Sequence, residues 1–235
     1  MEKIGQIRVA SVWIFILPLI VLNLCLFISI NHHLLDNTIF VVDQTGRTGF
    51  TFPYIDGSVS ISRTARGYPT YLIFKPGMII TAILLIKYWM ENNKVINIVN
   101  GEKNKNNRFM IFGILSAIFL IIHSIFLGVK LEYEFYQLFR KTVLLGFIIF
   151  EIVAQSLLVI NLFKIKSKIL ELINKRILIL KMILVSLLVI TAFVSLPILS
   201  AEGNTHIKHA LEWNYFVGVL TFYLLTFLFW KNKKT

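Results

Sequence analysis

Six long apolar runs constrain this chain more than any other feature of its sequence. A helix needs about 20 apolar residues to cross the hydrocarbon core of a bilayer, and each run is close to that length. Backbone groups in lipid must be hydrogen-bonded within the protein, so we expect every run to form a helix. The sequence therefore predicts an all-α, polytopic membrane bundle with six transmembrane helices, at residues about 10–31, 70–90, 109–129, 142–163, 177–199 and 210–230.

Composition favours one membrane domain over a soluble protein. Hydrophobic residues make up 57% of the 235 residues, above the roughly 45–50% of soluble domains. The connections between the runs are mostly short, and we expect residues 1–235 to form a single six-span domain. No small-x-small cleavage motif follows the first run, so we interpret it as an uncleaved anchor rather than a signal peptide.

Lysine and arginine residues predict how the bundle is oriented. The formal net charge of +12 would suggest a nucleic-acid partner for a soluble protein, but cytoplasmic loops of membrane proteins are rich in these residues. With both termini inside, 16 of the 24 basic residues lie in inner segments, six of them within 164–181. We therefore expect cytoplasmic termini and no nucleic-acid partner. The membrane is expected to be a bacterial cytoplasmic membrane, with a eukaryotic endomembrane or plasma membrane as the alternative.

The second run is the weakest of the six. Lys75, Pro76 and Gly77 lie near its start, and Lys87 lies near its end. If this run does not cross, the chain has five spans and an external N-terminus. Proline is tolerated in the first turn of a helix, and a long lysine side chain can extend to the headgroups, so we favour six spans.

The external loop from about 32 to 69 is the longest and most polar connection. Residues 38–42 and 49–52 flank a turn and predict a small β-hairpin. Loops of this length are more often functional than structureless. We therefore expect part of any binding site to lie here.

Three basic residues in and after this loop are candidates for a lipid headgroup. Arg63 and Arg66 carry guanidinium groups, which bind phosphate through two parallel hydrogen bonds, and Lys75 follows them. Their charges have an alternative role, since Asp43 and Asp56 lie in the same loop. The sequence leaves both roles open.

Two ionisable residues inside the spans stand out. Glu151 is near the middle of the fourth run, with Gln155 one turn away on the same face, and His123 lies in the outer third of the third run. Placing an ionisable group in hydrocarbon has a high free energy, so such groups usually face the bundle interior and serve a function. The alternative is a hydrogen bond that ties two helices together.

All five histidines fall in the outer half of the predicted bundle. His206, His209 and Glu212 are spaced at i, i+3 and i+6 at the start of the sixth span, while His32 and His33 follow the first. Such groups bind zinc or act as a general acid and base. They are also the amphipathic residues that membrane interfaces favour, and no H-E-x-x-H motif is present. We expect no metal and no cofactor.

The inner segment 164–176 interleaves isoleucine and leucine with lysine. An amphipathic basic segment of this kind can lie on an anionic inner leaflet. The alternative is an ordinary positively charged inner loop.

Short motifs resemble the Frag/DRAM/Sfk family of six-span membrane proteins, which includes the lipid-remodelling factors of GPI-anchored proteins. Pro-Tyr-Ile-Asp at 53–56 lies in a long first external loop, and Ile73-Phe74 enters the second span. His-Ala-Leu-Glu-Trp at 209–213 resembles the start of the family's last span, and His123 lies where the third span often has a histidine. The resemblance implies six spans and a role in lipid handling, lipid asymmetry or autophagy modulation.

These observations lead to one main functional hypothesis. The protein is expected to bind phospholipid or a lipid-linked group in its outer half, with membrane lipids as partners. Arg63, Arg66 and Lys75 would meet the headgroup. A polar pocket beneath the loop would consist of the side chains of His123, His209 and Glu212.

Two alternatives belong to other classes of protein. The first is a membrane-embedded lipid hydrolase or acyltransferase that uses His123 or His209 as a base, together with Glu212. The second is a proton-coupled transporter with Glu151 as the relay. The sequence does not indicate the oligomeric state or the ligand.

Overall fold

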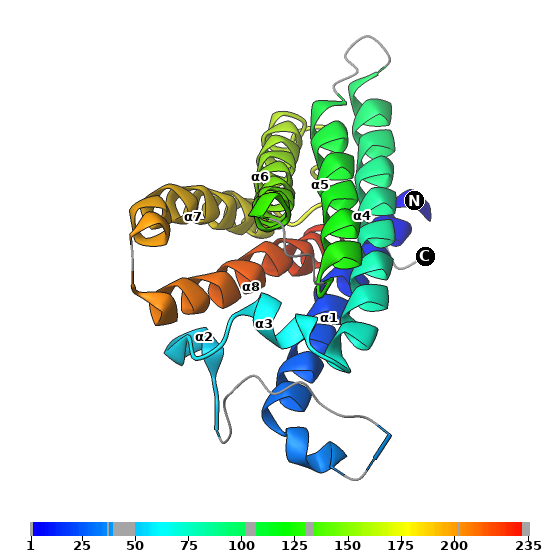
Figure 1. Ribbon diagram of the computed structural model, residues 1–235. Coiled ribbons are helices and arrows are strands. Elements are labelled where there is room, and N and C mark those ends of the chain that lie inside the picture. Colours follow the sequence, from blue (N-terminus) through cyan, green and yellow to red (C-terminus); the bar gives the residue numbers. More distant parts are fainter. Residues whose placement is uncertain are drawn as a thin grey trace.

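The computed structural model describes residues 2–36, 38–39, 50–101, 107–129, 134–201 and 203–231. Six helices in it are long and apolar enough to cross a membrane, which confirms the predicted multi-pass membrane protein (Figure 1). They are α1 (Glu2–Ile30), α4 (Thr70–Asn100), α5 (Arg108–Phe126), α6 (Glu134–Lys164), α7 (Lys175–Ser200) and α8 (Thr205–Phe229). Short helices complete the described part: η1 (His32–Leu35), α2 (Pro53–Asp56) and α3 (Ile61–Arg66).

The weakest predicted span, α4, is one continuous helix of 31 residues. It begins at Thr70, so Pro76 lies in its second turn rather than its first, on an exposed face. The helix continues to Asn100 rather than ending near residue 90. Its extension is stabilised by an ion pair between Lys94 and Glu91 at 2.5 Å.

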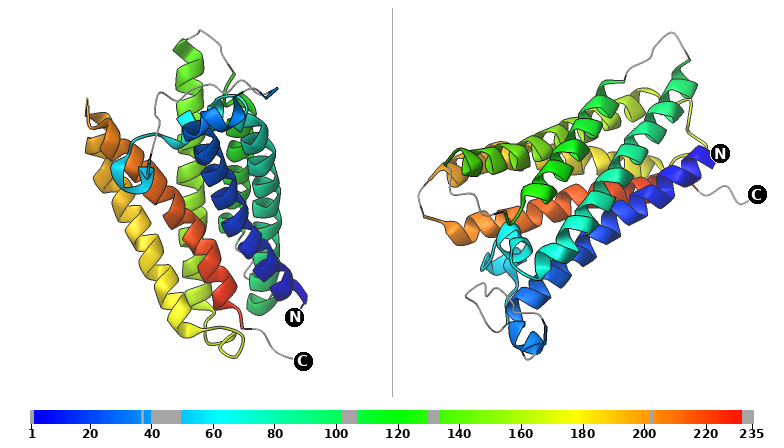
Figure 2. Two further views of the ribbon diagram at one scale, coloured as in Figure 1. Left: turned by 90° about the horizontal axis from the view of Figure 1, so that it is seen from below. Right: turned by 45° about the vertical axis from the view of Figure 1, so that its right-hand side comes forward.

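The six long helices form a ring in chain order, and α8 returns to pack against α1. Figure 2 shows that α1 begins and α8 ends at the same end of the bundle. There the Arg8 guanidinium lies 4.7 Å from the centre of the Phe227 ring. We call this the terminal end, and the opposite one, which carries α2 and α3, the loop end.

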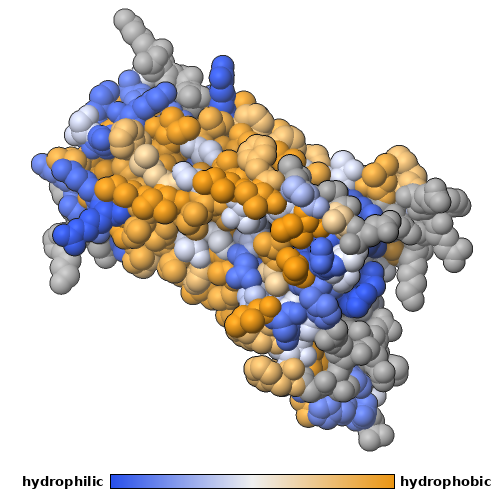
Figure 3. All heavy atoms as spheres, turned by 90° about the vertical axis from the view of Figure 1, so that its left-hand side faces the viewer, coloured by the Kyte–Doolittle hydropathy of each residue, from blue (hydrophilic) through white to orange (hydrophobic). Residues whose placement is uncertain are grey.

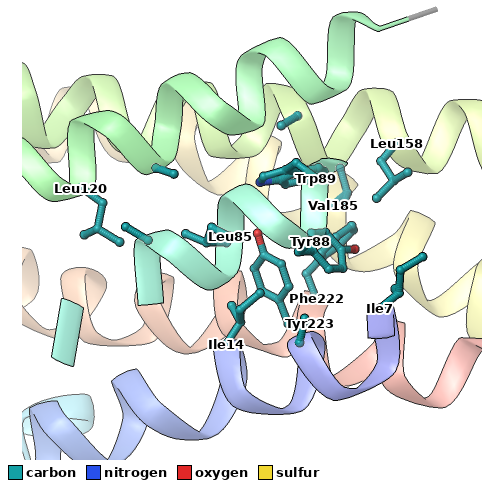
Figure 4. Close-up of a cluster of buried hydrophobic side chains, with 14 of the residues drawn as sticks. Ile7, Ile14, Leu85, Tyr88, Trp89, Leu120, Leu158, Val185, Phe222 and Tyr223 are labelled. Atoms are coloured by element: carbon teal, nitrogen blue, oxygen red, sulfur yellow. The ribbon is translucent and has the colours of Figure 1, made fainter. Parts of the chain in front are cut away.

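Aromatic side chains from α4 and α8 meet inside the ring (Figure 4). The rings of Tyr88 and Tyr223 lie edge to face with their centroids 5.0 Å apart, and Trp89 packs on Tyr88 at the same distance. Gly113 of α5 faces this cluster, and a Cβ there would lie 2.3 Å from the Trp89 ring. The close contact between α4 and α5 therefore requires glycine at this position.

The outer surface of the bundle is suited to lipid. Figure 3 shows a broad apolar surface between two ends where hydrophilic residues gather. Many exposed side chains on α7 are large and apolar, among them Ile179, Ile183, Leu187, Ile190 and Phe193. Exposed apolar residues of this number are unfavourable in water and favourable in hydrocarbon.

The predicted β-hairpin is wrong for the part of it that the structure describes. Residues 40–49 lie outside the described residues, and no strand occurs in the described ranges. Ile39 is 88% exposed and Phe50 is 98% exposed, so neither side chain packs against another segment of the protein. The chain instead enters α2 at Pro53, whose fixed φ suits the first position of a helix.

The segment 165–174 closes the terminal end of the bundle. The side chains of Ile165, Ile169 and Ile173 are buried within the protein, so they do not insert into the inner leaflet. The backbone N–H of Asn174 donates to the Phe229 carbonyl at 2.9 Å and fixes the segment to the end of α8. The lysines between the isoleucines are exposed.

Candidate functional site

Polar side chains in the first three turns of α8 bind the backbone of segment 53–62 at the loop end. We call this arrangement the α8 clamp. His206 Nδ1 donates to the Asp56 carbonyl at 3.2 Å, and His209 Nδ1 donates to the Gly57 carbonyl at 3.0 Å. Because a carbonyl oxygen can only accept, both imidazoles carry a proton on Nδ1.

Two more side chains extend the clamp along α8. The Trp213 indole donates to the Val59 carbonyl at 2.9 Å, and the Asn214 amide donates to the Tyr54 carbonyl at 2.6 Å. The Tyr54 hydroxyl donates to Asn23 Oδ1 of α1 at 3.1 Å. Burial raises the pKa of this phenol, so Tyr54 keeps the proton that it donates.

Glu212 binds the start of α3. Its carboxylate accepts the backbone N–H groups of Ile61 and Ser62, which have no partner within so short a helix. The Ser60 hydroxyl caps the same helix by accepting from the Arg63 N–H at 3.2 Å. Together these bonds hold α3 in one orientation on the bundle.

Gly57 allows the clamp to close. Its φ of 56° is left-handed, and a Cβ there would lie 1.7 Å from the His206 carbonyl oxygen. The Asp56 carboxylate shapes the turn by accepting from the Phe52 and Ser58 N–H groups, at 3.0 and 2.7 Å. The motifs 53–56 and 209–213 also contact each other directly, since the ring centroids of Tyr54 and Trp213 lie 4.9 Å apart.

The remaining histidines form none of the clamp's hydrogen bonds. His123 is buried on α5, and its Nδ1 has no hydrogen-bond partner. His32 and His33 belong to η1, with ring centroids 6.2 Å apart. Across the described ranges, no three His, Cys, Asp or Glu side chains come close enough to hold a metal ion.

The three headgroup candidates differ in their surroundings. Arg63 and Arg66 are exposed one turn apart on α3, and neither forms an ion pair with a described residue. The Asp56 carboxylate binds backbone N–H groups, and Asp43 lies outside the described residues. Lys75 Nζ instead donates to the Ile125 carbonyl at 3.1 Å, near the C-terminal end of α5.

Glu151 lies inside the ring and is 1% exposed. Ser116 Oγ donates to Oε2 at 2.6 Å, Gln155 Nε2 donates to Oε1 at 3.0 Å, and the Tyr223 hydroxyl also donates to Oε1. Gln155 Nε2 is in addition 3.4 Å from the Val219 carbonyl. These hydrogen bonds of Glu151 join α5, α6 and α8.

Lys181 is a buried polar residue that the sequence analysis placed in the basic inner loop. It is fully buried on α7, and its Nζ donates to Thr226 Oγ1 at 2.7 Å. The same nitrogen lies 3.9 Å from the Phe222 ring centre. Thr226 Oγ1 also shares a hydrogen bond with the Tyr88 hydroxyl at 3.1 Å.

The sequence does carry one signal for Lys181, because this residue lies within the predicted span 177–199. An ionisable side chain within a span is expected to face the protein interior rather than lipid.

Comparisons with models of protein families, with curated proteins and with solved structures found no match. The fold and the site define a six-helix integral membrane protein with a clamped loop at one end and a polar core.

Proposed function

We propose that this membrane protein binds an anionic lipid headgroup or lipid-linked group at its loop end, as its resemblance to Frag/DRAM/Sfk proteins implies. The observation that carries the proposal is the placement of Arg63 and Arg66. Both are exposed on one helix without an ion-pair partner among the described residues. Two guanidinium groups one turn apart suit the oxygens of a phosphate.

The rigidity of α3 supports binding. The Thr64 carbonyl near the middle of α3 accepts from Ser29 Oγ of α1 at 3.1 Å and from Thr70 Oγ1 of α4 at 2.7 Å. Glu212 of α8 fixes the beginning of the helix. A surface that is ordered before binding loses less entropy when the ligand arrives.

The location of α3 supports a lipid rather than a soluble ligand. The helix lies between the end of α1 at Ile30 and the start of α4 at Thr70. These positions are the ends of two spans, where a bilayer places its headgroups. His209 and Glu212 then support the site indirectly, because they bind backbone groups of the segment that leads into and begins α3. Lys75 binds the Ile125 carbonyl of α5 instead.

The geometry favours binding over catalysis. A hydrolase or acyltransferase needs a nucleophile within hydrogen-bond distance of a base that a third group orients. His209 and Glu212 are occupied in the clamp, and His123 Nδ1 contacts no such partner in the described part of the chain.

Lipid retention by charge variants tests the proposal. The double variant Arg63→Ala/Arg66→Ala is reconstituted in nanodiscs that contain a trace of anionic lipid, and bound lipid is quantified after exchange into detergent. Lys175→Ala/Arg176→Ala removes equal charge from exposed positions at the terminal end. We expect only the α3 variant to lose anionic lipid. Equal retention by both variants and the wild type would refute the headgroup role.

A further inference from the structure

The carboxylate of Glu151 has no counter-charge among the described residues. It is 1% exposed and forms no ion pair in the described part of the chain. An isolated negative charge is strongly unfavourable inside a membrane bundle. The hydrogen bonds from Ser116, Gln155 and Tyr223 reduce this penalty but bring no positive charge.

Two hydroxyl groups and one amide group lie against this carboxylate. The Ser116 hydroxyl lies between it and the Gly113 carbonyl, which Ser116 contacts at 2.8 Å. The Gln155 amide nitrogen donates to Glu151, so the amide oxygen on the same carbon lies beside the site. That oxygen is buried and has no hydrogen-bond partner. A buried acceptor without a donor needs an explanation such as a bound ion.

We propose that Glu151, Gln155, Ser116 and Tyr223 form a binding site for one small monovalent cation, a proton or Na⁺. Carboxylate, amide and hydroxyl oxygens are hard ligands that suit hard cations. One carboxylate neutralises a single positive charge, whereas a divalent ion would leave a net charge in the bundle centre. The site stands on other residues than the lipid proposal and does not depend on it.

The titratable and charged groups around Glu151 come from several helices. Tyr223 of α8 contacts it directly, and Tyr88 of α4 lies against the Tyr223 ring. His123 lies two turns from Ser116 along α5, toward the loop end.

Lys181 of α7 is the one lysine in the described ranges whose side chain is fully buried. Its amine does not contact Glu151. Its Nζ binds Thr226, and Thr226 binds the Tyr88 hydroxyl. The Tyr88 hydroxyl is thus on the Lys181 side and the Tyr223 hydroxyl on the Glu151 side of an edge-to-face ring pair, which separates the two polar groups. Lys181 forms no ion pair with Glu151, so the carboxylate requires its own cation.

The test uses the full chain in nanodiscs with two measurements. Infrared difference spectra between acidic and alkaline buffer, in choline chloride, report a protonated carboxyl group. Melting temperature in rising NaCl, with choline chloride as the reference, reports Na⁺. The variants are Glu151→Gln and, as the matched control, Glu91→Gln, whose carboxylate is also buried but is paired with Lys94.

Each outcome decides the proposal. A carboxyl band that disappears in alkaline buffer, is missing from E151Q and is kept in E91Q assigns a proton. A rise in melting temperature with NaCl alone, lost in E151Q and kept in E91Q, assigns Na⁺. Wild-type protein that shows neither response overturns the site. If E151Q does not fold, Gln155→Met removes the amide oxygen instead, and responses identical to wild type then contradict the proposal.

Discussion

Replacing Gly57 with alanine tests whether the α8 clamp stabilises the protein. The added Cβ would lie 1.7 Å from the His206 carbonyl oxygen, so segment 53–62 has to move away from α8. Alanine in the left-handed region costs about 1–2 kcal/mol, and each lost hydrogen bond costs about 1 kcal/mol. With the bonds of His206 and His209 broken, we expect a loss of roughly 3–4 kcal/mol in unfolding free energy.

Gly203 supplies the matched control. Its φ of 80° is also left-handed, but a Cβ there meets nothing within 4 Å. Gly203→Ala should therefore lose only the backbone contribution, about 1–2 kcal/mol. Unfolding by SDS in mixed micelles measures both variants. Equal losses would refute the argument that close packing of Gly57 on α8 closes the clamp. G57A should also retain less anionic lipid than G203A, because α3 is no longer held.

The buried polar core gives two more predictions. Ser116→Ala removes a donor from the buried Glu151 carboxylate and should cost about 1–3 kcal/mol of unfolding free energy. Ser156→Ala, whose hydroxyl bonds its own helix at Ile152, should cost clearly less, and equal costs would contradict the role of Ser116. Lys181→Met replaces a buried amine with an apolar chain of similar length and should leave the melting temperature unchanged or raised. Thr226→Val removes the acceptor of that amine and should lower the melting temperature, so the reverse order would contradict this account.

The spans could be predicted because lipid imposes one simple rule. A run of apolar residues of the right length must be helical, and this held even for α4, which contains Pro76. Glu151 could be predicted as a buried polar group for the same reason, since a carboxyl group within such a run has to face the protein. Its helical neighbour Gln155 was found from spacing alone.

The clamp could not be predicted because its partners are backbone atoms. His209 and Glu212 were identifiable as unusual residues at the start of a span. Their acceptors and donors, the Gly57 carbonyl and the N–H groups of Ile61 and Ser62, have no signature in the sequence. Side chains that bind backbone groups therefore looked like candidates for a base or a metal ligand.

The proposed binding of an anionic lipid at the loop end is tested most directly by one measurement. Native mass spectrometry of the wild-type protein, released gently from its own membrane, would show which lipid remains bound. The account predicts a stoichiometric adduct whose headgroup carries a phosphate, and its loss when Arg63 and Arg66 are replaced by alanine. A protein that retains no lipid, or that retains the same lipid without these arginines, would contradict it.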